Sequence, residues 1–151
     1  YVIIDEAHHL EEQATAQFGL ELGRQDIAAF LGTLSQPDAT GPSGLLGQIP
    51  ALFDAYQVSG PVRQTIADQI ERLRNQIAIA MTNLEVLFRN LTLFLDDYRD
   101  TGARSQTTYD RTIRITPGIR IQPGWSDIEI ASDNLAAPLT QIVQGLDQIA
   151  S

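Results

Sequence analysis

Apolar residues recur at a regular interval through residues 61–100, and this is the strongest periodic pattern in the chain. Spacings of four and three residues alternate, so the average period is 3.5 residues, which is typical of a helix packed along partner helices. Pro61 suits the first turn of this helix and Gly102 suits its stop. At 1.5 Å per residue the helix would be roughly 60 Å long. The seam consists of Ile66, Ile70, Leu73, Ile77, Ala80, Leu84, Leu87, Leu91, Phe94 and Tyr98.

Shorter helical patterns precede this segment. Leu10, Ala14 and Phe18 stand four residues apart, as apolar residues do on one face of a helix. Prolines and glycines interrupt the pattern further along the chain. The sequence therefore predicts helices over about 7–22, 26–34 and 44–56, with a turn-rich loop over 35–44.

A last helix is predicted from about residue 126 to the end of the chain. Ser126 and Glu129 have the spacing of a capping box, and Trp125 stands where a hydrophobic staple would press on Ile130. Pro138 should kink or divide this helix, because proline lacks the backbone N–H that the helix ladder needs. The apolar stripe is still running at the final residues, so we expect the natural protein to continue.

Residues 112–122 alternate apolar and polar positions on both sides of Pro117-Gly118. A period of two predicts a short β-hairpin or a paired extended segment. Its isoleucines would face the helices, while Arg114 and Arg120 would face outward. The predicted fold is thus mainly α, an elongated bundle of about four helices, one of them very long, with a small β-hairpin or extended segment near 112–122. The inward residues would be Ile113, Ile115, Ile119 and Ile121.

Composition limits the kinds of site that the chain can carry. Its 151 residues suit one domain that can bury a core without disulfides. Cysteine and lysine are both absent, which excludes thiolate metal sites and a P-loop lysine within these residues. No uninterrupted apolar run approaches the roughly 18 residues of a membrane span, and nothing points to export. We therefore expect a cytoplasmic protein with no membrane partner.

Charge is unevenly distributed along the chain. The net charge of −9 argues against generic nucleic-acid binding, because phosphate contact usually leaves a basic footprint. Residues 99–120 are the exception, with five arginines against two aspartates, a net +3. The plainest interpretation is a solvated loop with scattered arginines. These arginines are Arg99, Arg104, Arg111, Arg114 and Arg120.

The opening residues carry the most specific chemistry in the sequence. Val2-Ile3-Ile4 is an apolar run followed by Asp5-Glu6, the arrangement of a Walker B strand that ends in two acids at the edge of a parallel sheet. In that arrangement the aspartate holds magnesium and the glutamate orients or deprotonates the attacking water. Two adjacent acids are needed because metal binding and water activation are separate tasks.

The motif continues as Asp5-Glu6-Ala7-His8-His9-Leu10-Glu11-Glu12, and with these flanking residues the sequence resembles the DEAH-type helicases, specifically the XPD and DinG family. Ile113-Arg-Ile-Thr followed by Pro123-Gly-Trp125 and a long apolar helix resembles the end of the DinG-type arch segment. In that family the arch domain follows motif II directly, and the iron–sulfur domain lies upstream. The resemblance therefore implies that residues 1–10 end a motor domain and residues 11–151 form an arch domain.

By this resemblance Asp5 binds the magnesium of Mg-ATP, usually through water. Glu6 also contacts Mg-ATP and activates the attacking water, and His8 couples hydrolysis to DNA. The parent protein would be an ATP-dependent DNA helicase, moving 5′ to 3′, with an iron–sulfur cluster upstream of this chain. The arch would help to form the passage for single-stranded DNA, with Tyr109 and the five arginines of 99–120 as DNA-binding residues.

Without a phosphate-binding loop, Glu6 has no nucleotide to act on. We therefore expect this chain alone to be a monomer without ATPase activity or a cofactor, and to work with the motor domains of its parent.

Other interpretations of the same residues remain. Asp5 and Glu6 could simply begin a solvent-exposed helix, since acids are favoured in a first turn. Glu6 and His9 have the spacing of a di-iron motif, but such sites use it twice and only two histidines exist. His8 and Glu12, one turn apart, could hold a single metal with ligands from elsewhere. Finally, the long seam could bind a partner helix, which would make the chain a helical protein-interaction module without nucleotide chemistry.

Overall fold

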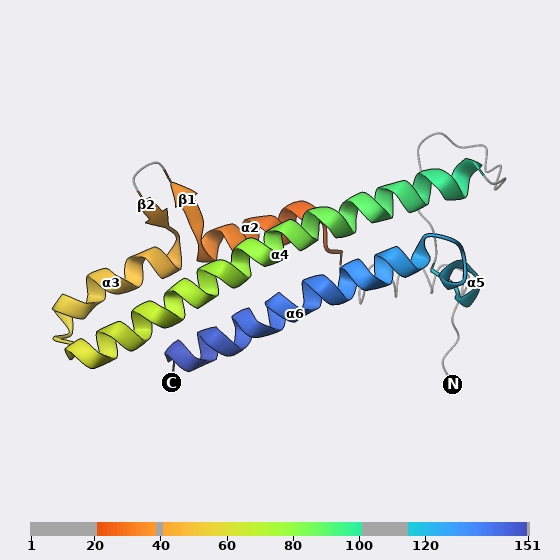
Figure 1. Ribbon diagram of the computed structural model, residues 1–151. Helices are drawn as coiled ribbons and strands as arrows, with labels where there is room; N and C mark the ends of the chain where they lie inside the picture. The colour runs from red at the N-terminus through yellow and green to blue at the C-terminus, as the bar shows by residue number, and fades with distance from the viewer. Residues whose placement is uncertain (1–20, 39–40, 101–114, 151) are drawn as a thin grey trace, which may run out of the picture.

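The computed structural model describes residues 21–38, 41–100 and 115–150. Within them the chain is mainly α and elongated, with one very long helix, as the sequence predicts (Figure 1). A short antiparallel ribbon joins the first two helices, with Gln36 opposite Ser43. The helices are α2 (Arg24–Leu34), α3 (Leu45–Ala55), α4 (Gly60–Asp100), α5 (Pro117–Arg120) and α6 (Trp125–Ala150), and the strands are β1 (Gln36–Asp38) and β2 (Gly41–Ser43).

The antiparallel pair α4 and α6 forms the body of the molecule (Figure 1). Asn83 donates through Nδ2 to the carbonyl of Asn134 at 2.8 Å, and seven residues further along α4 Asn90 reaches the carbonyl of Asp127 at 3.1 Å. A step of seven residues toward the C-terminus of α4 thus corresponds to a step of seven residues toward the N-terminus of α6, as in an antiparallel pair. The two hydrogen bonds therefore share one register of α4 against α6. The seam predicted for 61–100 is therefore closed within the chain. Its fully or nearly buried residues include Ile70, Leu73, Ile77, Ala80 and Leu84 of α4 and Leu135 and Ile142 of α6.

The helices α2 and α3 cover one half of α4, where Leu31, Leu34 and Leu46 enter the same core. The connection between α3 and α4 is held by Arg63. Its Nε donates to the carbonyl of Val58 at 2.7 Å, and its Nη1 reaches Asp54 at 2.7 Å. One guanidinium thus joins the end of α3 to the start of α4.

The ribbon between α2 and α3 lies where the sequence predicts a loop. Ser43 closes it by donating through Oγ to the carbonyl of Gln36 at 2.8 Å. Gly44 follows with a φ of 90°, and a Cβ at that position would lie 2.8 Å from the carbonyl oxygen of Leu34. Glycine is required there because an L side chain would meet both strain and backbone.

The hairpin predicted over 112–122 is wrong in the part that the structure describes, and Ile113 and Arg114 lie outside that part. Residues 117–120 form the single turn α5, with Pro117 in the first position, where its fixed φ and missing N–H are tolerated. Ile119 is buried, whereas Ile115 is 55% exposed and Ile121 is 83% exposed. The alternating isoleucines therefore do not share a face.

Two predictions about the last helix are also wrong. The helix α6 begins at Trp125, so Ser126 lies inside its first turn and is not the capping residue. Trp125 turns toward α4 and α5 while Ile130 is exposed, and the predicted staple between them does not form. Pro138 is buried within α6, which continues undivided on both sides of it. The helix predicted over about 7–22 does not include residues 21–22, which the structure shows outside any helix, and its earlier residues are not described.

Part of α4 is apolar enough to cross a bilayer by length and composition, with a mean hydropathy of 1.3 over its best window. Helix α4 also supplies Ala80 and Leu84 to the core shared with α6. The core helix of a soluble protein can pass the same test, and 22% of that window is buried inside the described fold.

Candidate functional site

One end of the bundle brings together the end of α4, the short helix α5 and the start of α6 (Figure 1). A second, smaller core fills this end and is separate from the main one. We call it the aromatic end; its buried residues are Phe94, Ile119, Trp125 and Ile128. Tyr98 packs against this cluster and is partly buried.

The rings of the aromatic end contact one another in two geometries. Phe94 and Trp125 meet edge to face, with centroids 5.6 Å apart at 73°. Phe94 and Tyr98 stack at 6.1 Å and 22°. Such arrangements are favoured because they align the ring quadrupoles. The indole Nε1 of Trp125 donates to Glu129 at 2.8 Å, so the polar edge of the ring also has a partner.

These contacts give Tyr98 a structural role, in the packing of the aromatic end. The sequence predicts that Tyr98 ends the apolar seam of 61–100, and its contact with Phe94 confirms that placement. The stacking residue predicted for DNA is Tyr109, which lies outside the described residues.

Two of the predicted DNA-binding arginines fall on elements of the aromatic end. Arg99 lies in the last turn of α4 and Arg120 is the last residue of α5, where it is exposed. The segment 101–114 connects these two helices and carries Arg104, Arg111 and Arg114, which are outside the described residues. Both helices that flank the basic segment are thus held at one end of the molecule.

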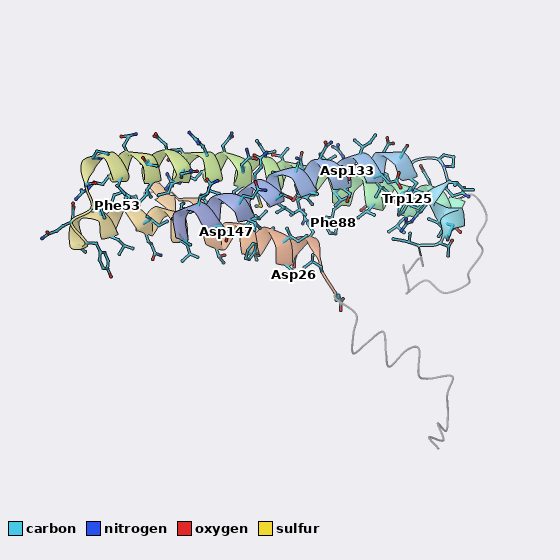
Figure 2. All side chains as sticks on the ribbon, turned by 90° about the horizontal axis from the view of Figure 1, so that it is seen from below. Asp26, Phe53, Phe88, Trp125, Asp133 and Asp147 are labelled. Carbon is cyan, nitrogen blue, oxygen red and sulfur yellow. The ribbon has the colours of Figure 1, made fainter. Side chains whose placement is uncertain are left out.

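Three other described arginines have acidic partners. Arg24 is paired with Glu85 at 2.7 Å, Arg63 with Asp54 at 2.7 Å, and Arg74 with Glu71. Helix α6 has four acids and no basic residue, and Figure 2 shows Asp133 and Asp147 along it with Trp125 at its other end. A negatively charged strand of nucleic acid would be repelled by the acids of α6, two of which, Asp127 and Glu129, lie near Trp125, whereas Arg72 and Arg89 are exposed basic residues of α4. The acids of α6 are Asp127, Glu129, Asp133 and Asp147.

The motif residues Asp5, Glu6 and His8 lie outside the described residues, as does the alternative metal pair of His8 and Glu12. Among the residues that the structure does describe, no group of acids and histidines is arranged to hold a metal ion. The chain comes from the motif into α2, whose first residue, Arg24, is fixed to the middle of α4 by its pair with Glu85.

Comparison with protein-family models, with curated proteins and with solved structures finds no match to this chain. A functional assignment therefore depends on the motif residues and on the geometry given above. Trp125 is the residue whose importance the sequence understated, because its contacts with α4 and α5 join segments distant in the chain. The sequence pointed to it only as a staple on Ile130 and as part of Pro123-Gly-Trp125.

Proposed function

We propose that this chain is the arch segment, with motif II attached, of a DinG/XPD-like ATP-dependent DNA helicase. The observation that carries the proposal is the eight-residue match Asp5-Glu6-Ala7-His8-His9-Leu10-Glu11-Glu12 after an apolar strand-like run. An elongated helical body supports it, with Arg99 in the last turn of α4 and Arg120 at the end of α5, two helices that meet at the aromatic end. An elongated body of this kind suits a structure that borders a path for DNA.

In this proposal the chemistry belongs to the parent protein. Asp5 holds the magnesium of Mg-ATP and Glu6 activates the attacking water, while His8 couples hydrolysis to DNA. Residues 1–10 complete the motor and residues 11–151 form the arch. The phosphate-binding loop and the iron–sulfur cluster are supplied upstream, and the parent moves 5′ to 3′ along single-stranded DNA in the cytoplasm.

The DNA path passes the aromatic end. Arg99 and Arg120 flank in sequence the segment that contains Arg104, Arg111, Arg114 and Tyr109. Arginine binds phosphate through paired N–H donors, and a tyrosine ring stacks on any base, so such a path needs no sequence preference.

The proposed DNA path can be tested by comparing unwinding by two double variants of the parent helicase. Arg111→Glu with Arg114→Glu reverses two charges in the basic segment, and Arg72→Glu with Arg89→Glu reverses two exposed charges on α4. The first pair should lower unwinding at least about tenfold and weaken the salt dependence of single-strand binding by roughly 1.4 in log–log slope, since two phosphate contacts are lost. The second pair should leave both values near those of the wild type. Equal unwinding by the two double variants would refute the assigned path.

The alternative function is a helical protein-interaction module without nucleotide chemistry. Several large apolar side chains that are exposed on the described surface favour it, among them Phe30, Leu52, Ile130 and Val143. The seam of α4 cannot serve this role, because α6 already covers it. Nucleotide-dependent activity of the parent would exclude this alternative.

A further inference from the structure

A groove lies between α2 and α4 and extends to the start of β1. Its volume is about 690 Å³, which is in the range of sites that hold a small molecule. The core residue Ile77 forms part of its lining, so the groove borders the main core. Gly32 also lines the groove, and a Cβ added there would meet no atom within 4 Å. The groove is therefore open beside this glycine.

One end of the groove is apolar. Helix α2 runs antiparallel to α4 (Figure 1), and Arg24, the first residue of α2, pairs with Glu85 of α4 at 2.7 Å. Both helices rise 1.5 Å per residue, so residues at equal steps from this pair lie near one another. Four residues along each helix, Ala28 comes beside Met81, and both line the groove. An aliphatic chain at this end would contact apolar side chains.

The other end of the groove is polar. Eleven residues along from the same pair, Ser35 comes beside Arg74, and Gln36 lines the groove as well. Arg74 is the one charged residue among the described residues that line the groove. A molecule with an aliphatic chain and an anionic group at one end therefore matches the order of apolar and polar groups along the groove.

The guanidinium of Arg74 has a hydrogen-bond donor to offer such a molecule. Its Nη1 pairs with Glu71 one turn away, and the side chain of Glu71 is 69% exposed, so solvent screens that pair. The Nε atom is buried and has no hydrogen-bond partner within the part of the chain that the structure describes. Leaving a buried donor without a partner costs free energy, and a carboxylate can accept from two N–H groups of one guanidinium. A carboxylate in the groove would satisfy Nε once the side chain of Arg74 turns toward it.

We infer that the groove between α2 and α4 binds a small carboxylate with a single aliphatic chain, with the carboxylate at Arg74 and the chain directed toward Met81. The seven residues from Arg74 to Met81 span roughly 10 Å along α4, so a short chain suffices to fill this length. This inference is independent of the proposed helicase role.

Met81 provides a direct readout of the groove, because it is the only methionine in the chain. When the full chain is isotopically labelled at the methionine methyl group, its single NMR signal reports on the apolar end. The probes are octanoate and octanol, which share one aliphatic chain but carry a carboxylate and a hydroxyl group respectively. Octanoate should shift the signal saturably and bind at least about tenfold more tightly than octanol, since only octanoate can pair with Arg74. The absence of a saturable shift, or equal affinities for the two probes, would overturn the inference.

A matched pair of arginine variants tests the polar end. Arg74→Gln should weaken octanoate binding at least about tenfold and leave octanol binding unchanged, because only the carboxylate loses its partner. Arg72→Gln removes the same charge at an exposed position of α4 outside the groove and should change neither affinity. Octanoate binding by Arg74→Gln at the affinity of the wild type would contradict the assignment of the carboxylate to this arginine.

A matched pair of glycine variants tests the groove itself. Gly32→Leu fills the groove from a position with free space and should abolish the shift for both probes. Gly60→Leu adds the same side chain in free space at the start of α4, away from the groove, and should bind both probes as the wild type does. Thermal melting of each variant shows whether the fold is retained. Undiminished octanoate binding by a folded Gly32→Leu variant would mean that the ligand does not occupy this groove.

Discussion

At the scale of single residues, Trp125 and Arg63 each connect segments that are far apart or differently directed. Trp125 fills the space between Phe94 and Ile119 and donates to Glu129. Arg63 binds Asp54 and two backbone carbonyls across the turn between α3 and α4. These contacts could not be predicted from the sequence, because the spacing of residues along the chain does not show which helix ends and turns meet in the fold. The capping-box spacing of Ser126 and Glu129 even favoured a different start for α6.

Truncation of Trp125 should destabilise the aromatic end strongly. Trp125→Ala is expected to lower the free energy of unfolding by about 3–5 kcal/mol, since it leaves a cavity beside Phe94. Trp125→Phe keeps an aromatic ring but loses the hydrogen bond to Glu129, so its cost should be about 1–2 kcal/mol. Urea unfolding followed by circular dichroism measures both. Similar stability of the alanine variant and the wild type would show that the ring does not hold this end together.

Substitution of Arg63 by lysine separates geometry from charge. Lysine keeps the positive charge near Asp54 but cannot donate at once to the carbonyls of Val58 and Phe53. Because Arg63 is partly exposed, solvent screens part of the effect, and a loss of about 1 kcal/mol in unfolding free energy is expected. Arg72→Lys, at an exposed position of α4, is the control and should change stability by less than about 0.5 kcal/mol.

At the scale of elements, the sequence predicts the helices well where one face is buried over many turns. The period of 61–100 continues through α4, and the predictions for α2 and α3 are confirmed within a few residues. The strand pairing predicted for 112–122 is wrong because an alternation of apolar and polar residues over so few positions does not distinguish a strand from a turn. Pro117 starts a helical turn there, and only Ile119 finds a buried site. The ribbon β1–β2 was missed because three-residue strands carry no measurable alternation.

Two glycines in helices provide a matched test of this packing. Gly145 lies where α6 approaches α4 closely, and a Cβ there would be 2.6 Å from the Leu73 side chain in the core. Gly145→Ala should therefore destabilise the fold by about 1–3 kcal/mol through overpacking. Gly32→Ala adds a methyl group in open space and removes the entropic cost of glycine, so it should stabilise by about 0.5–1 kcal/mol. Opposite shifts in the urea midpoint are expected, and shifts of the same sign would contradict the assigned packing.

At the scale of the whole molecule, the fold and the candidate site were predictable to different degrees. The bundle follows from periodicity, whereas the site follows from the resemblance carried by Asp5–Glu12 and from the sign of charge over 99–120. The structure places Arg99 and Arg120 on elements of one end, and it describes neither the motif nor the segment 101–114. Under the proposed function the site needs a phosphate-binding loop from elsewhere in the parent, because the chain has no lysine for one.

The isolated chain is expected to be catalytically silent. Purified residues 1–151 should hydrolyse Mg-ATP no faster than their Glu6→Gln variant, because the phosphates have no cradle in which to be oriented. A coupled phosphate-release assay measures both rates. Turnover by the wild-type chain above that of the variant would mean that these residues form a complete nucleotide site.

The central claim is that Asp5-Glu6-Ala7-His8 is the motif II of a DNA-dependent motor. Steady-state ATP hydrolysis by the full-length parent, with and without single-stranded DNA, measures this most directly. We predict hydrolysis that single-stranded DNA stimulates, with kcat lowered at least about 100-fold by Glu6→Gln, since loss of water activation removes roughly 3 kcal/mol of transition-state stabilisation. Undiminished hydrolysis by the Glu6→Gln parent, or a parent without DNA-stimulated hydrolysis, would contradict the claim.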